Sequence, residues 1–139
     1  MTDRGNKAYL LDTSAAITLI EDEPGAERVE DLLRAERVVV PFVVGLEVYY
    51  ITRRERTPDE ADRRLALIRR LPAIWVDRVS EAVLVTAGNL KSRHRLSLAD
   101  ALVAAFAIDA GAILVHKDPE YEKLGSVVEQ GRLPSKAAE

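Results

Sequence analysis

The chain has 139 residues, of which 47% are hydrophobic and 31% are charged, and its formal net charge is −3. This length suits one domain with a sizeable core, and the composition is that of a folded globular protein rather than a disordered one. Because the chain has no cysteine, disulfides, thiolate metal sites and cysteine nucleophiles are excluded. The small negative charge means that any attraction for nucleic acid has to be local.

Neither a signal peptide nor a membrane span is predicted. The first six residues are polar, and the longest apolar run, residues 98–115, is interrupted by Asp100, Asp109 and Gly111. We therefore expect a soluble cytoplasmic protein with a single domain over residues 1–139. Its ordered core should cover about residues 7–128, between a polar N-terminal lead and a frayed C-terminal tail from Gly131.

Apolar and β-branched runs alternate with stretches of helical periodicity along the chain. Strands are predicted at residues 8–11, 37–40, 73–77 and 112–115, with a further brief strand at 126–128. Helices are predicted at residues 13–21, 24–35, 42–56, 57–71, 80–95 and 98–110, followed by a short helix around Tyr121. Strands that alternate with helices through short turns predict a parallel α/β sandwich.

Two apolar strands end in a carboxylate. Residues 8–14 read Ala-Tyr-Leu-Leu-Asp-Thr-Ser, and Asp118 lies beyond the apolar residues 112–115, after His116 and Lys117. In open parallel sheets the functional crevice lies beyond the carboxyl ends of the strands, so Asp12 and Asp118 are candidates for an acidic site. Either acid could instead simply cap the helix that follows it.

Two further acids interrupt apolar helices. Glu47 lies within residues 42–56, where an unpaired buried carboxylate would be costly, so we expect a cation, a metal or a cleft beside it. The alternative is that Glu47 lies on an exposed strip or pairs with Arg54. Asp100 opens a helix with few polar residues, although Ser97-Leu-Ala-Asp also has the form of a capping box.

Parallel strands would bring these acids to one rim of the sheet. Asp12 and Asp118 would share that rim, and helices returning to it could supply Glu47 and Asp100. Crowded carboxylates raise one another's pKa values unless a cation neutralises them. A ligand set of oxygens without Cys or His favours Mg²⁺ or Mn²⁺ over zinc.

The four acids, in this order, resemble those of PIN-domain ribonucleases. The resemblance rests on Leu-Leu-Asp12-Thr-Ser, on Glu47 in an apolar helix, on Ser-Leu-Ala-Asp100-Ala and on Ile-Leu-Val-His-Lys-Asp118-Pro-Glu-Tyr. It is greatest to the VapC toxins of bacterial and archaeal toxin–antitoxin systems and covers roughly residues 7–128. The resemblance implies a PIN-like three-layer α/β/α sandwich with a central parallel sheet of four to five strands.

The same resemblance implies a metal-dependent endoribonuclease that hydrolyses RNA phosphodiester bonds. Asp12, Glu47, Asp100 and Asp118 would be its catalytic residues and would hold Mg²⁺, for which Mn²⁺ could substitute. A cognate VapB-like antitoxin and a second copy of the chain in a homodimer are the implied protein partners. Two departures affect this expectation. His116 stands where many members have a small hydroxyl residue, and Glu120 where several have a further Asp.

Neighbouring hydroxyl and basic residues are candidates for supporting roles. Thr13 and Ser14 would assist near the metal or substrate, and Lys91, Arg93 and Arg95 could hold flanking phosphates. Cations at a helix C-terminus are favourable in any protein, so the basic residues are not specific to RNA. The most basic region is the arginine-rich segment 53–70, which could equally be a solvated arginine face.

Three other functions are compatible with parts of the sequence. A noncatalytic PIN-like protein-interaction module would keep the fold without the chemistry. A receiver-type phospho-acceptor domain also has strand-end aspartates and Mg²⁺, but Lys117 here directly abuts Asp118 instead of ending a late strand alone. A Ser/His/Asp hydrolase would use His94 or His116, but no nucleophile-elbow motif lies nearby.

Overall fold

The computed structural model describes residues 7–135, so the predicted polar lead and residues 136–139 of the predicted tail lie outside the described residues. Five strands form one parallel sheet in the order β3-β2-β1-β4-β5. They are β1 (Ala8–Leu11), β2 (Arg37–Pro41), β3 (Ile74–Val76), β4 (Ala112–His116) and β5 (Gln130–Arg132). The predicted α/β fold with a parallel sheet of four to five strands is confirmed.

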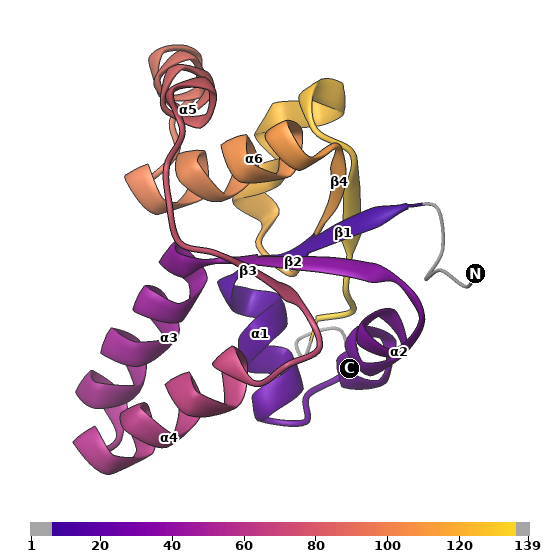
Figure 1. Ribbon diagram of the computed structural model, residues 1–139. Coiled ribbons are helices and arrows are strands. Elements are labelled where there is room, and N and C mark those ends of the chain that lie inside the picture. Colours follow the sequence, from indigo (N-terminus) through magenta and orange to yellow (C-terminus); the bar gives the residue numbers. More distant parts are fainter. Residues whose placement is uncertain (1–6, 136–139) are drawn as a thin grey trace.

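Helices cover both faces of this sheet (Figure 1). They are α1 (Thr13–Ile20), α2 (Ala26–Ala35), α3 (Phe42–Glu55), α4 (Pro58–Arg69), α5 (Glu81–Arg93), α6 (Leu98–Ala110) and the 3₁₀ segment η1 (Pro119–Val127). Helices α5 and α6 lie on one side, and α1, α3 and α4 lie on the other. Three layers result, as the PIN-like resemblance implied. None of the helices within residues 7–135 is long and apolar enough to cross a membrane.

The two central strands, β1 and β4, contribute buried residues to the core, and their carboxyl ends form the rim of the sheet. Leu10 and Leu11 of β1 and Leu114 of β4 are completely buried, which is why these strands read as continuous apolar runs. Leu11 pairs with Val115 in the parallel register, and the backbone N–H of Asp12 donates to the carbonyl of Val115 at 3.1 Å. β1 therefore ends beside Val115, one residue before the end of β4, and both strands reach the same rim of the sheet.

The fifth strand differs from the prediction. Residues 126–128, predicted as a strand, belong to the end of η1 and its C-cap, and the strand is Gln130–Arg132 instead. The predicted frayed tail from Gly131 is also wrong at its start, because Leu133 is 4% exposed and its N–H donates to the carbonyl of His116 at 2.7 Å. Pairing with the buried β4, rather than the polar local sequence, makes this segment a strand.

Two helices also differ in detail. Helix α2 begins at Ala26 rather than at residue 24, because Gly25 takes a φ of 103° that is incompatible with a right-handed helix. Helix α3 is not buried on most sides as its apolar sequence suggested. Leu46 is 54% exposed and Tyr50 is 40% exposed.

The α3–α4 hairpin packs against β3 through one close approach. A methyl group at Gly45 would lie 2.7 Å from the indole of Trp75 and 3.3 Å from the side chain of Leu65. The guanidinium of Arg69 also lies over the indole of Trp75, 4.7 Å from the ring centre. Gly45 therefore has no side chain for a steric reason, since any larger residue would displace the indole.

We predict that Gly45→Ala destabilises the fold by about 1 to 3 kcal/mol, because overpacking forces neighbours out of their positions. The matched control is Gly88→Ala on α5, where nothing lies within 4 Å of the added carbon. This control should stabilise the protein by up to about 1 kcal/mol through helix propensity. Urea unfolding measures both changes, and equal effects at the two positions would contradict the packing argument.

Candidate active site

Asp12 lies at the junction of β1 and α1 and is 3% exposed. Its Oδ1 accepts hydrogen bonds from the hydroxyl of Ser14 at 2.7 Å and from the backbone N–H of Ala15 at 2.9 Å. The carboxylate is thus the N-cap of α1, as the structural alternative predicted. This cap leaves part of the carboxylate free to accept further hydrogen bonds or to bind a cation, because its two oxygens together can accept about four hydrogen bonds.

Ser14 links the ends of the two central strands. Its hydroxyl donates to Asp12 and accepts the backbone N–H of Lys117 at 2.9 Å, across 103 positions of sequence. One residue further, Asp118 caps η1 by accepting the N–H of Glu120 at 2.9 Å. The chain thus leaves β4 in a fixed direction, with Asp118 near Asp12.

Glu47 reaches the same rim from α3. Its Oε1 accepts the hydroxyl of Thr13 at 2.5 Å, and its side chain is half-buried. The alternative pairing with Arg54 is wrong, because no ion pair joins the two side chains among the described residues. The Arg54 guanidinium lies 5.2 Å from the centre of the Tyr50 ring. Thr13, the residue after Asp12, therefore connects the first strand end to the acid on α3.

Asp100 is held from a direction that the sequence did not reveal. The predicted cap at Ser97 is present, since its hydroxyl accepts the N–H of Asp100 at 3.0 Å. In addition, the hydroxyl of Tyr121 donates to Oδ1 of Asp100 at 3.2 Å. Tyr121 is 1% exposed, and the sequence had suggested only that it packs the short helix after β4.

Tyr121 is itself supported by β4 and β5. Its ring lies 4.9 Å from the ring of His116, and Gln130 of β5 donates from Nε2 to its backbone carbonyl at 2.9 Å. Because that amide nitrogen donates, Gln130 Oε1 accepts from Nε2 of His116 at 2.8 Å. Burial lowers the pKa of His116, so the ring is neutral and acts here as a hydrogen-bond donor that packs against Tyr121.

Burial and neighbouring acids raise the pKa values of Asp12 and Asp100. Burial raises the pKa of Asp12 to about 7, the charges of Asp100 and Asp118 act in the same direction, and the two hydrogen bonds to its Oδ1 oppose them. The pKa of Asp100 is raised by burial first, then by Asp118, with a further contribution from Glu47. All four acids therefore belong to one electrostatic neighbourhood.

The donor chemistry of this neighbourhood fits a hard divalent cation. Its side chains offer only oxygens, and a cation would relieve the repulsion that raises the pKa values of Asp12 and Asp100. The side chains are not arranged as a closed ligand set, since residues 7–135 contain no group of three or more Asp, Glu or His that could hold a metal ion as they lie.

The predicted basic residues are exposed, or bonded to the backbone. Lys91 donates from Nζ to the carbonyl of Leu96 at 2.7 Å and so stabilises the turn between α5 and α6. Arg93 and Arg95 are exposed. Among the described side chains, no hydrogen bond or ion pair joins these three residues to the four acids. Their proposed role with phosphates stays a prediction.

The arginine-rich segment 53–70 is not one uniform basic face. Arg56 and Arg64 both approach Glu21, at 3.5 and 3.0 Å, which neutralises part of the segment. Arg53, Arg54 and Arg69 stack over aromatic rings instead.

Comparisons with known proteins agree with this architecture. A family model described as the PIN domain matches residues 9–127. The crystal structure of VapBC2 from Rickettsia felis, bound to a DNA fragment from its promoter, aligns with a TM-score of 0.75 at 17% identity, over 91% of this chain and 99% of that chain. Curated protein sequences gave no match.

Two further solved structures are similar. VapBC-1 from nontypeable Haemophilus influenzae aligns with a TM-score of 0.69 at 22% identity, over 90% of this chain and 97% of that chain. VapC20 from Mycobacterium tuberculosis, a toxin that cleaves the sarcin–ricin loop, aligns with a TM-score of 0.67 at 17% identity, over 84% and 95% respectively. At these identities the likeness to solved structures shows the fold.

We predict that Asp12→Asn stabilises the metal-free protein. The unfolded state releases the Asp12 proton near pH 3.8, whereas the folded state keeps it to about pH 7, so folding loses stability as the pH rises between these values. The difference corresponds to about 4 kcal/mol above pH 7, and asparagine avoids this cost while still accepting the cap hydrogen bonds.

Thermal unfolding in EDTA tests this prediction. Asp12→Asn should gain roughly 1 to 4 kcal/mol at pH 8 and less at pH 5, where the wild-type carboxyl is still protonated when folded. Asp77→Asn, which removes an exposed carboxylate after β3, should change stability by less than about 0.5 kcal/mol at either pH. A loss of stability in Asp12→Asn at pH 8 would contradict the argument that the charged, buried carboxylate of Asp12 destabilises the folded state.

Proposed function

This chain belongs to the PIN domain family, and from that premise we propose that it is a metal-dependent endoribonuclease and the toxin of a VapBC-type toxin–antitoxin system. The observation that carries the proposal is the gathering of three acids around the buried Asp12. Asp100 and Asp118 raise the pKa of Asp12, and Asp118 and Glu47 raise that of Asp100. A buried acid beside other carboxylates is costly unless it serves a ligand or a reaction.

The four acids would act as one catalytic set. Asp12 and Asp118, which follow the central strands, would be direct ligands of Mg²⁺, and Glu47 and Asp100 would complete the set or orient its waters. When bound, such an ion lowers the pKa of a bound water and stabilises negative charge on the scissile phosphate. Mn²⁺ would substitute, because it prefers the same oxygen ligands.

The hydrogen-bond partners of the acids would keep them oriented for this work. Thr13 and Ser14 donate to Glu47 and Asp12, which leaves the remaining oxygens of both acids for a metal or for water. Tyr121 donates to Asp100 in the same manner. These neutral donors stabilise the charged form of each acid without competing as ligands.

The partners follow from the same family argument. Structures similar to this chain include VapBC complexes from Rickettsia felis and Haemophilus influenzae, which supports a VapB-like antitoxin. Leu84 and Val85 on α5 are 61% and 50% exposed, which supports contact with another protein chain, including a homodimer partner. The substrate would be RNA, cleaved in the cytoplasm by this one domain.

We predict that Asp100→Asn abolishes RNA cleavage while the fold is retained. Asparagine is isosteric and keeps an oxygen that can accept from Tyr121, but it removes one negative charge from the acidic set. Cleavage of labelled RNA with Mg²⁺ should fall by about a hundredfold or more, and growth arrest on expression should disappear. EDTA should abolish wild-type cleavage, and Mn²⁺ should restore it.

Asp109→Asn provides the matched control, because it removes an exposed carboxylate at the other end of the same helix. It should cleave RNA like the wild type. Unchanged cleavage in Asp100→Asn would refute the assignment. Wild-type protein that cleaves no RNA and binds no Mn²⁺ would instead favour the noncatalytic interaction module.

A further inference from the structure

Helix α3 carries two arginine–tyrosine stacks with the same spacing in different surroundings. The guanidinium of Arg53 lies 5.8 Å from the centre of the Tyr49 ring, and that of Arg54 lies 5.2 Å from the centre of the Tyr50 ring. Tyr49 also donates its hydroxyl to Asp62 on α4 at 3.1 Å, so the first stack is part of the α3–α4 contact. The second stack faces solvent, since Tyr50 is 40% exposed.

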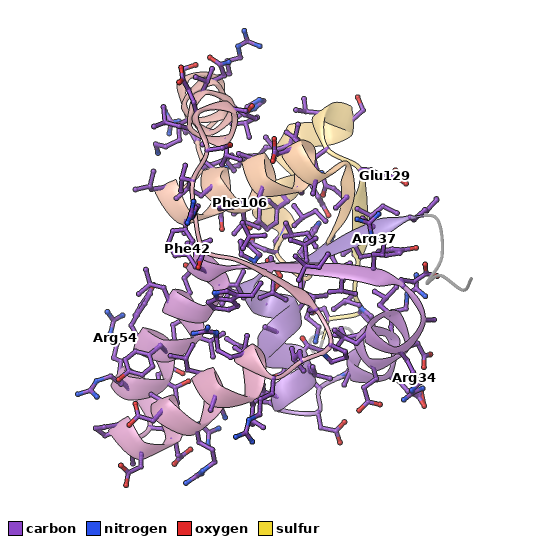
Figure 2. All side chains as sticks on the ribbon, viewed as in Figure 1. Arg34, Arg37, Phe42, Arg54, Phe106 and Glu129 are labelled. Atoms are coloured by element: carbon purple, nitrogen blue, oxygen red, sulfur yellow. The ribbon has the colours of Figure 1, made fainter. Side chains whose placement is uncertain are left out.

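The exposed stack lies on the same face of α3 as Glu47, and we call Glu47, Tyr50 and Arg54 together the row. Residues three, four and seven positions apart share one face of a helix, so Tyr50 and Arg54 follow Glu47 along α3. At 1.5 Å per residue they lie about 5 Å and about 10 Å from Glu47 along the helix axis. Figure 2 shows Arg54 far along α3 from Phe42, the residue that begins the helix.

Arg54 also differs from other arginines of this region in its charge environment. Arg56 and Arg64 approach Glu21, but no carboxylate of the described residues lies within ion-pair distance of Arg54. A guanidinium binds phosphate oxygens through two parallel hydrogen bonds, and an aromatic ring stacks with any base. This row therefore combines the two contacts by which proteins hold a single nucleic acid strand.

We propose that Tyr50 and Arg54 form a subsite for a nucleotide of single-stranded RNA that flanks the scissile phosphate. The base stacks on the Tyr50 ring, and the Arg54 guanidinium binds the phosphate. This proposal rests on the proposed nuclease function and extends it to substrate binding. RNA is the occupant that this face favours, because it is continuous with the acidic site and because Arg54, at its far end, has no carboxylate within ion-pair distance among the described residues.

The subsite would contribute affinity rather than sequence preference. Stacking is tolerant of base identity, because every base has an aromatic face, and a phosphate contact carries no sequence information. It would also provide the local attraction that a chain with a net charge of −3 needs for a polyanion.

Binding of a fluorescein-labelled single-stranded oligouridine, measured by fluorescence anisotropy in EDTA, tests the subsite without cleavage. Tyr50→Ala should weaken binding about tenfold, as for other stacked bases. Arg54→Gln should weaken binding. It should also reduce the slope of the logarithm of the binding constant against the logarithm of the salt concentration by about 1, the value for one phosphate contact. Iodouridine-substituted RNA should cross-link under ultraviolet light to the peptide that contains Tyr50.

Two matched variants distinguish the subsite from general electrostatics. Arg53→Gln removes the neighbouring stacked charge, and Arg37→Gln removes an exposed charge at the start of β2, on the far side of the molecule from Arg54 (Figure 2). Both should change the dissociation constant by less than about twofold, and all four variants should melt like the wild type because their side chains are at the surface.

Three outcomes would overturn the proposal. They are wild-type affinity in Tyr50→Ala, an equal loss in Arg37→Gln and Arg54→Gln, or no binding of the RNA by the wild type. In the first case, a change of mass in Tyr50→Ala by light scattering would make this face an interface between copies of the chain. Persistent cleavage by Asp100→Asn would count only against the nuclease assignment, so the two failures are distinguishable.

Discussion

The burial of the Asp12 carboxylate beside other acids is the constraint around which this rim of the sheet is arranged. A carboxylate that is 3% exposed loses most of its hydration, and the nearby charges of Asp100 and Asp118 add to the cost. Donors from Ser14 and Ala15 recover part of it. Because the same Ser14 hydroxyl accepts the N–H of Lys117, the local compensation also fixes how β4 leaves the sheet. Stability and site geometry are thus joined in one small set of hydrogen bonds.

The far edge of the sheet supports the site indirectly. Gln130 on β5 binds both His116 and the backbone of Tyr121, and Tyr121 in turn holds Asp100. Burial keeps His116 neutral by lowering its pKa, so the ring can lie beneath Tyr121 without adding a charge. A residue that departs from the family pattern therefore has a structural part here, in packing the aromatic ring that orients an acid.

Positive charge is distributed locally rather than over the whole surface. Glu21 forms ion pairs with Arg56 and Arg64, and Lys117 pairs with Glu23 at 3.5 Å. The cations that remain available include Arg54, which lies on the same face of α3 as Glu47. A weakly acidic protein can in this way offer a polyanion a narrow binding track, while its remaining surface avoids nonspecific attraction.

The sequence by itself determined the order of elements, the parallel sheet and the four candidate acids. Local apolar patterns are enough to predict where strands end and which helix faces are buried. It misplaced the fifth strand, since Gln130–Arg132 is polar and becomes a strand only by pairing with β4. It did not reveal the contact of Tyr121 with Asp100, which are 21 positions apart, nor which of two identical arginine–tyrosine spacings on α3 faces solvent. Those features depend on which elements pack together, and only the tertiary structure decides that.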